Sequence, residues 1–213
     1  MHNYDEISAK VAEQLLQIKA VKLSPTKPFK WASGWNSPIY CDNRVALSYP
    51  QVRTYLRQKF ATYISEEYSS ADCIAGVATG GIAIGALVAE ELGLPFVYVR
   101  AKAKAHGTQN LIDGELTPGW KTVVIEDLIS TGKSSLNAVE ALKEANAKVL
   151  GMTAIFTYGF SVAEKNFEKA ACPLYTLTDY HKLLEVAQEH GYLNSEYFET
   201  LHEWREAPEK WNK

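Results

Sequence analysis

Short apolar runs alternate with segments of helical periodicity along most of the chain. From residue 73 onward, the runs are rich in Val, Ile, Leu, Phe and Ala, and the segments between them repeat their apolar residues every three or four positions. Apolar runs of this length are typical of strands buried on both faces, and strands that alternate with helices form a parallel sheet. The predicted strands are Cys73–Val77, Phe96–Val99, Thr122–Ile125, Leu150–Tyr158 and Leu174–Leu177.

The segments between these strands predict helices. The first helix of the chain shows the pattern clearly, because Ile7, Val11 and Leu15 fall on one helical face. The predicted helices are Tyr4–Lys19, Gln51–Tyr68, Ile82–Leu92, Ser134–Ala147, Val162–Ala170 and His181–His190, with a further helical segment at Asn194–Ala207. The sequence therefore predicts an α/β fold with a parallel five-stranded sheet flanked by helices.

Residues of about 20–50 do not follow this alternation. The segment is rich in proline, yet the aromatic residues Phe29, Trp31, Trp35 and Tyr40 make it unlike a linker. We interpret it as a small folded hood over a core of about 51–213, within one domain of residues 1–213. The two tryptophans would either stack on a ring-shaped ligand or pack the hood on the sheet.

Composition narrows the class of protein. The chain has 213 residues, 46% of them hydrophobic, and a net charge of −3, which suits one globular domain and gives no sign of a nucleic-acid or membrane partner. We expect no signal peptide and no membrane span. Cys41, Cys73 and Cys172 are odd in number and widely spaced, which predicts reduced thiols in a cytoplasmic protein.

Two carboxylates and a hydroxyl-rich turn follow the third predicted strand. Glu126 and Asp127 come where that strand leaves the sheet, the edge at which open α/β sheets bind ligands. Ser130 to Ser134 then place hydroxyls and free backbone N–H groups at a helix start, which favours a phosphate. Side-by-side acids are costly unless a ligand uses them, so an ordinary turn is the weaker interpretation. The pattern suits a phosphorylated sugar such as ribose 5-phosphate.

The ending Gly132-Lys133-Ser134 also occurs in the Walker A loop of nucleotide-binding proteins. That loop needs a glycine five residues before the Gly-Lys pair, where the backbone touches phosphate. The residue at this position is Asp127, so a Walker A loop is excluded.

The long segment Arg100–Lys121 has neither a helical nor a strand period. Connections of this length in compact domains are usually lids or binding loops. It begins with four groups that are or can become cationic: Arg100, Lys102, Lys104 and His106. In a chain of net negative charge, this cluster predicts an anionic ligand. The Thr79-Gly80-Gly81 turn is a weaker anion candidate at the same sheet edge, because two glycines let backbone amides approach a ligand closely.

These segments resemble the type I phosphoribosyltransferases. Val123–Ser135 resembles their signature for phosphoribosyl pyrophosphate (PRPP). The Arg100–Gly107 loop, the hood segment Ser33–Arg44 and the later Glu203-Trp204-Arg205 resemble the orotate phosphoribosyltransferase family in particular. The motifs occur in the expected order, and the resemblance extends over nearly the whole chain. Ala32 and Gly80 depart from the pattern, since many members have a lysine at the first position and some have one at the second.

The resemblance implies a role for each of these residues. The implied PRPP-binding residues are Thr79, Gly80, Gly81, Arg100, Lys102, Lys104, His106, Glu126, Asp127, Leu128, Ile129, Ser130, Thr131, Gly132, Lys133 and Ser134. Glu126 and Asp127 would hold the ribose hydroxyls. Ser130 and Tyr40 would contact orotate. Lys104, His106 and Asp127 would be the catalytic residues.

The resemblance also implies a reaction and an assembly. Ribose 5-phosphate would pass from PRPP to orotate, giving orotidine 5′-monophosphate and pyrophosphate in pyrimidine synthesis. Mg²⁺ would be held mainly through PRPP rather than by protein ligands. A homodimer is expected, in which the Arg100–Gly107 loop completes the neighbouring site.

Two functions are considered as alternatives to orotate phosphoribosyl transfer. A purine or uracil phosphoribosyltransferase would keep the Val123–Ser135 segment and lose the hood and the cationic loop. A non-catalytic PRPP-sensing regulator would lose Lys104 and add a DNA-binding element, for which the sequence has no basic helix-turn-helix candidate.

The cationic loop leads to a first prediction. Lys104→Ala should lower kcat by on the order of 10²-fold or more, because it removes a charge that stabilises the departing pyrophosphate. Folding should barely change. Steady-state kinetics beside a thermal melt tests this, and wild-type turnover in the variant would exclude Lys104 as the partner of the leaving group.

Overall fold

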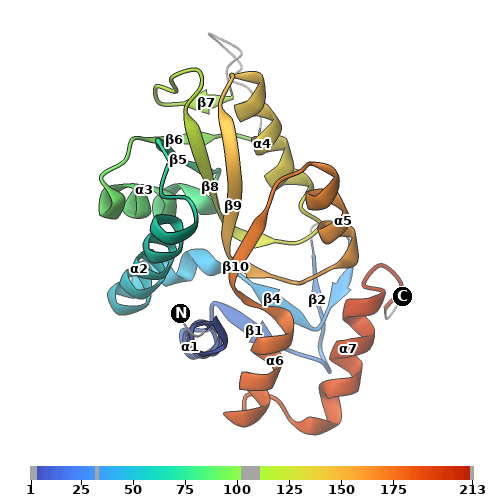
Figure 1. Cartoon of the computed structure of the whole chain (residues 1–213). Coiled ribbons are helices and arrows are strands. Elements are labelled where there is room, and N and C mark those ends of the chain that lie inside the picture. The colour runs from blue at the N-terminus through green and yellow to red at the C-terminus, as the bar shows by residue number, and fades with distance from the viewer. Residues whose placement is uncertain (1–3, 32–33, 102–110, 212–213) are drawn as a thin grey trace.

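A six-stranded sheet forms the centre of the protein in the computed structural model, which describes residues 4–31, 34–101 and 111–211 (Figure 1). The strands follow the order β10-β9-β8-β5-β6-β7. Their bounds are β5 (Cys73–Val77), β6 (Phe96–Val99), β7 (Ile112–Asp113), β8 (Lys121–Ile129), β9 (Lys148–Thr157) and β10 (Leu174–Asp179). The five predicted strands are all present and parallel, which confirms the predicted fold class.

Two differences from the predicted strands affect the site. The short strand β7 pairs antiparallel with β6 inside the segment expected to be a loop. Strand β8 runs to Ile129, four residues beyond its predicted end, because β9 pairs with it as far as Ile129 and Thr157. Glu126 and Asp127 therefore lie within the strand instead of after it, and their backbone is held by the sheet.

Helices cover both faces of this sheet (Figure 1). Their bounds are α1 (Tyr4–Gln17), α2 (Pro50–Glu67), α3 (Gly80–Leu92), α4 (Lys133–Glu144), α5 (Ser161–Lys169), α6 (Tyr180–Glu189) and α7 (Phe198–Glu206), with short 3-10 helices η1 (Asn43–Ser48) and η2 (Ser195–Tyr197). Side chains of α4 and α5 share one apolar cluster with Val124, and the remaining α-helices share the other cluster with Val123 and Ile125. Successive residues of β8 thus face opposite sides of the sheet, which is the period of two expected for a strand buried on both faces.

Residues of the hood form two small antiparallel sheets and η1. Strand β1 (Val21–Leu23) pairs with β4 (Ile39–Cys41), and β2 (Phe29–Lys30) pairs with β3 (Asn36–Ser37). The carboxyl end of β8 lies beneath this segment, because buried Asn43 donates a hydrogen bond to the backbone oxygen of Asp127.

Helix α7 holds the hood from its other side. The indole of Trp204 is fully buried and donates through Nε1 to the oxygen of Asn36, at 3.1 Å. The Trp31 ring contacts the rings of Tyr158 and Trp204, with centroids 5.0 Å and 5.5 Å apart. Trp31 therefore packs the hood on the core, one of the two roles considered for it.

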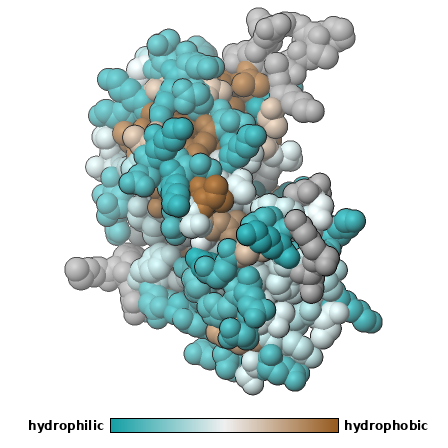
Figure 2. All heavy atoms as spheres, turned by 90° about the vertical axis from the view of Figure 1, so that its right-hand side faces the viewer, coloured by the Kyte–Doolittle hydropathy of each residue, from teal (hydrophilic) through white to brown (hydrophobic). Residues whose placement is uncertain are grey.

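One face of the molecule is mostly polar. On this face, shown in Figure 2, hydrophilic residues predominate and hydrophobic residues form small patches among them. None of the helices within the described residues is both long enough and apolar enough to cross a bilayer.

The packing of Trp204 leads to a stability prediction. Trp204→Ala should lower the free energy of unfolding by about 3–5 kcal/mol, because it removes a fully buried indole and the hydrogen bond to Asn36. Urea unfolding measures the loss. Trp204→Phe should cost less, since a ring remains in place. An alanine variant as stable as the wild type would show that α7 does not secure the hood.

Candidate functional site

The carboxyl end of β8 carries one buried and one half-buried acid. Glu126 is 5% exposed, and its Oε1 accepts a hydrogen bond from the Asp127 backbone N–H at 2.9 Å. Its Oε2 accepts from the Ser135 hydroxyl at 3.0 Å, in the first turn of α4. Burial raises the pKa of Glu126 well above its usual range, and the adjacent Asp127 adds to the rise. Glu126 thus ties the start of α4 to the strand.

The Asp127 side chain lies against the turn that follows β5. A Cβ atom built at Gly80 would overlap the Asp127 carboxyl group, and one at Gly81 would overlap the Ile125 oxygen. Both glycines belong to the first turn of α3, which begins two residues earlier than predicted. The structure therefore brings the predicted Thr79–Gly81 turn and the acidic strand end together, and only residues without a side chain allow this approach.

The turn between β8 and α4 leaves the helix start open. Gly132 is the N-cap residue with a φ of +76°, and no side-chain hydrogen bond caps the helix within the described part of the chain. Asn166 donates to the oxygen of Thr131 at 3.0 Å, which holds the turn in place from α5. Lys133 and Ser134 are exposed at the first helical positions. Free N–H groups at a helix start can bind anions such as phosphate, and this is the feature on which the predicted phosphate site depends.

Arg100 lies at the same sheet edge. Its Nε is 3.0 Å from Asp113 Oδ2, and its backbone N–H donates to the Leu111 oxygen. A small cavity of about 70 Å³ is lined by both Arg100 and Ser134, so the base of the cationic loop adjoins the start of α4. Lys102, Lys104 and His106 lie outside the described residues.

A pocket of about 320 Å³ opens between the hood and the carboxyl end of the sheet. It is lined by Lys30, Trp31, Tyr40, Cys41, Leu128, Ser130 and Tyr158. Tyr40 and Ser130, predicted from the resemblance to contact the same ligand, do meet here. Lys30 and Tyr158 also line the pocket and were not predicted, because no local pattern connects β2 and the residue after β9 to this place. The aromatic walls suit a flat ring, and Lys30 supplies a positive charge.

A larger hollow of about 560 Å³ lies between α1, α2 and α6. Its charged lining residues mix both signs and include Glu6, Lys10, Glu13, Lys59 and Glu189. It contains none of the predicted site residues and no strand end. Size alone therefore does not identify the functional site here.

The described residues offer few protein ligands for a metal. Within residues 4–31, 34–101 and 111–211, no group of three or more His, Cys, Asp or Glu side chains is arranged to hold an ion. The half-buried carboxylate of Asp127 is a hard oxygen donor beside the glycine turn. This donor suits Mg²⁺ when a substrate provides most of the remaining oxygen ligands.

Burial of Glu126 leads to a pH prediction. Because the pKa of Glu126 is higher in the folded than in the unfolded protein, folded molecules bind more protons between the two values, and stability falls as pH rises through that window. The window opens near the ordinary value of 4.5. Glu126→Gln should remove this part of the fall, so its stability relative to the wild type should increase with pH. Urea unfolding over a pH series measures this, and parallel curves for the two proteins would contradict it.

Comparison with known proteins agrees with this geometry. Residues 48–180 match the family described as "Phosphoribosyl transferase domain". An orotate phosphoribosyltransferase of Porphyromonas gingivalis is 57% identical over 201 residues, which cover 94% of this chain and 96% of the relative.

Two solved structures share the fold. An orotate phosphoribosyltransferase from Aeropyrum pernix has a TM-score of 0.75 at 24% identity, over 86% of this chain and 99% of that chain. The enzyme from Mycobacterium tuberculosis in complex with PRPP has a TM-score of 0.66 at 19% identity, over 83% and 98%. From the family match and the close sequence relative, the chain belongs to the orotate phosphoribosyltransferases of the phosphoribosyltransferase family.

Proposed function

We propose that this chain transfers ribose 5-phosphate from PRPP to orotate, giving orotidine 5′-monophosphate and pyrophosphate, as a step of pyrimidine nucleotide synthesis. The observation that carries the proposal is the meeting of an acid-bearing strand end, an uncapped helix start and an aromatic pocket at one sheet edge. Membership of the family agrees with this reaction.

PRPP fits along the edge of the sheet. The 5-phosphate would accept hydrogen bonds from the Ser130–Ser134 turn and the start of α4. The ribose hydroxyls would donate to Asp127, whose carboxylate is the more exposed of the two acids. Glu126 would support this arrangement from within, because its oxygens already accept from the Asp127 backbone and Ser135. The diphosphate would then lie beside the Thr79–Gly81 turn.

Orotate fits the aromatic pocket. Its ring would lie against Tyr40, which is 40% exposed and therefore open to a ligand, with Ser130 as a hydrogen-bonding partner. The carboxylate of orotate needs a cation, and Lys30 is the lysine or arginine among the lining residues that could supply it. Lys30 would thus fill the role that the resemblance would have given to a lysine at position 32.

Charge separation is the main demand of the reaction. Breaking the bond to pyrophosphate builds positive charge on the sugar and negative charge on the leaving group. Asp127, through its contacts with the ribose hydroxyls, would lie beside the sugar on which the positive charge forms. Bound Mg²⁺ would neutralise part of the charge on the leaving group. Lys104 and His106 would add to this when the loop closes, which would also exclude water.

The proposed role of the Arg100–Gly107 loop implies a dimer. The loop would reach the site of a neighbouring subunit, so the active form would be a homodimer. We place this homodimer in the cytoplasm. Light scattering of the purified protein, together with mixing of two inactive variants altered in the loop and in Asp127, tests the shared site.

A spectrophotometric assay tests the proposed function. Loss of orotate absorbance should require both PRPP and Mg²⁺. Replacing orotate with uracil or a purine base in parallel reactions distinguishes the alternative transferases. Binding of PRPP without turnover of any base would favour the regulator and contradict the proposal.

The pocket leads to a specificity prediction. Lys30→Ala should raise KM for orotate about tenfold, the loss expected for one charged hydrogen bond, and should leave KM for PRPP nearly unchanged. Lys27→Ala is the matched control, since Lys27 is an exposed hood lysine that does not line the pocket. Equal KM values for orotate in the two variants would show that Lys30 does not bind orotate.

A further inference from the structure

We infer that Arg44 of the hood binds the diphosphate of PRPP. This inference rests on the proposed function. It adds a cation from the described part of the chain to the glycine turn and the cationic loop, and it gives η1 a direct part in binding substrate.

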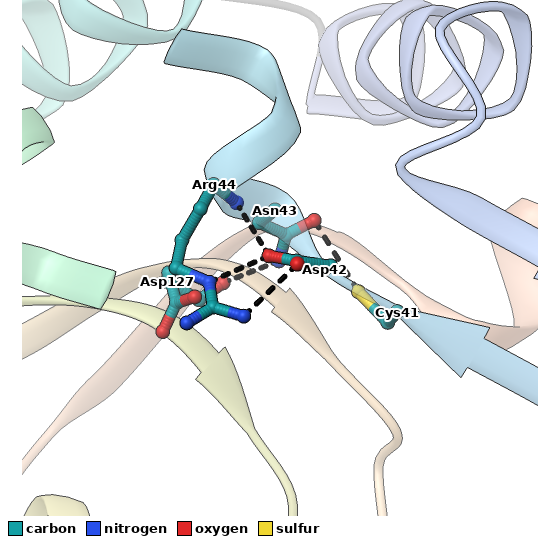
Figure 3. A network of polar contacts seen from close by, with 5 residues as sticks. All are labelled: Cys41, Asp42, Asn43, Arg44 and Asp127. Carbon is teal, nitrogen blue, oxygen red and sulfur yellow. Dashed lines mark hydrogen bonds and ion pairs between the residues drawn. The ribbon is translucent and has the colours of Figure 1, made fainter. Parts of the chain in front are cut away.

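The first support is the position of Arg44. Figure 3 shows its guanidinium extending from the start of η1 toward the Asp127 carboxylate. Arg44, Gly80 and Asp127 line one small hollow of about 10 Å³, so these three residues are neighbours although the chain separates them widely. The pKa of Arg44 is raised mainly by Asp42 and further by Asp127. Arg44 is therefore a permanent cation between the hood and the glycine turn.

The second support is the way the guanidinium is held. Its Nε donates to Asp42 Oδ1 at 2.7 Å, and its Nη2 donates to Asp42 Oδ2 at 2.9 Å. This two-point contact fixes the plane of the group and uses two of its five N–H donors. Among the described residues, the hydrogen bonds and the ion pair of the guanidinium involve Nε and Nη2 and none involves Nη1. The side chain is 55% exposed, so a ligand can reach the remaining donors from solvent.

The third support is that the backbone of this segment is held without the Arg44 side chain. Asp42 caps η1 by accepting from the Arg44 backbone N–H, and Asn43 donates to the Asp127 oxygen at 2.6 Å. Both hydrogen bonds would remain if Arg44 were shortened. In this pair the Arg44 side chain is 55% exposed and that of Asp42 is 24% exposed, and ion pairs open to solvent add little stability. The guanidinium is thus not required to hold the segment.

Substrate chemistry connects these observations. In PRPP the diphosphate is attached to C1, and the neighbouring C2 carries one of the hydroxyls proposed to bind Asp127. A group beside both Asp127 and Gly80, as Arg44 is, would therefore lie next to the diphosphate. An arginine held in a fixed plane suits a phosphate better than a mobile lysine does, because its donors match two phosphate oxygens at once.

Kinetics of Arg44→Ala tests the inference. KM for PRPP should rise about tenfold to a hundredfold, as expected when charged hydrogen bonds are lost, while KM for orotate stays nearly constant. Arg44→Lys should recover part of the loss. Arg57→Ala is the control, because it removes another arginine paired with a carboxylate, Glu91 at 3.0 Å, on helix α2, and should leave both KM values unchanged. Arg44→Gln replaces the alanine variant if that protein does not fold.

A double variant separates direct binding from an indirect effect. Removing Arg44 alone leaves Asp42 without its partner, and that negative charge could itself repel PRPP. Asp42→Asn combined with Arg44→Ala restores the original net charge without the guanidinium. A high KM for PRPP in this double variant supports direct binding, whereas a return to the wild-type value overturns it.

Calorimetry with inorganic pyrophosphate and Mg²⁺ provides a readout independent of turnover. Binding should weaken for Arg44→Ala and not for Arg57→Ala. Equal binding by both variants overturns the role of Arg44. If the wild-type protein consumes no orotate, the proposed function fails instead, so the two failures are distinguishable.

Discussion

The structure of the site depends on the placement of two adjacent acids inside a central strand. Burying the carboxyl group of Glu126 is unfavourable, and it is tolerated because the Asp127 backbone N–H and the Ser135 hydroxyl both donate to it. The Asp127 backbone oxygen accepts from Asn43, and its carboxylate covers Gly80. The hood, the α3 turn and α4 are thus positioned against the same two residues. Strand β8 therefore fixes the positions of these three parts of the site relative to one another.

Positive and negative groups come from different parts of the fold. The acids belong to the central sheet, whereas Lys30 and Arg44 belong to the hood. Arg100 is the first residue after β6, at the start of the long loop. A ligand with hydroxyls and several anionic groups can contact both kinds of residue at once. Substrate binding would therefore add contacts between the hood and the sheet, beyond those of Asn43 and Trp31.

Much of the fold could be predicted from local patterns. Apolar residues recur with a period of two in strands and of 3.6 in helices, and both periods can be recognised from residues close together in the sequence. The five parallel strands were predicted in this way, whereas the helix start after β8 was predicted from its hydroxyl and glycine residues. The end of β8 was not, since polar Glu126 and Asp127 look like a turn until the register with β9 is known. Strand β7 is too short to produce a pattern. Lys30, Tyr158 and the position of Arg44 depend on contacts between distant segments, which no single stretch of sequence encodes.

The close approach of Gly80 to Asp127 has a consequence for substitution at position 80. A side chain at position 80 would have to displace the Asp127 carboxyl group, so a lysine introduced there would also move the acid proposed to bind ribose. The two positions lie on different elements, and a change at one therefore constrains the other. With glycine at position 80, a cation beside this turn has to come from another segment, and Arg44 of the hood lines the same hollow.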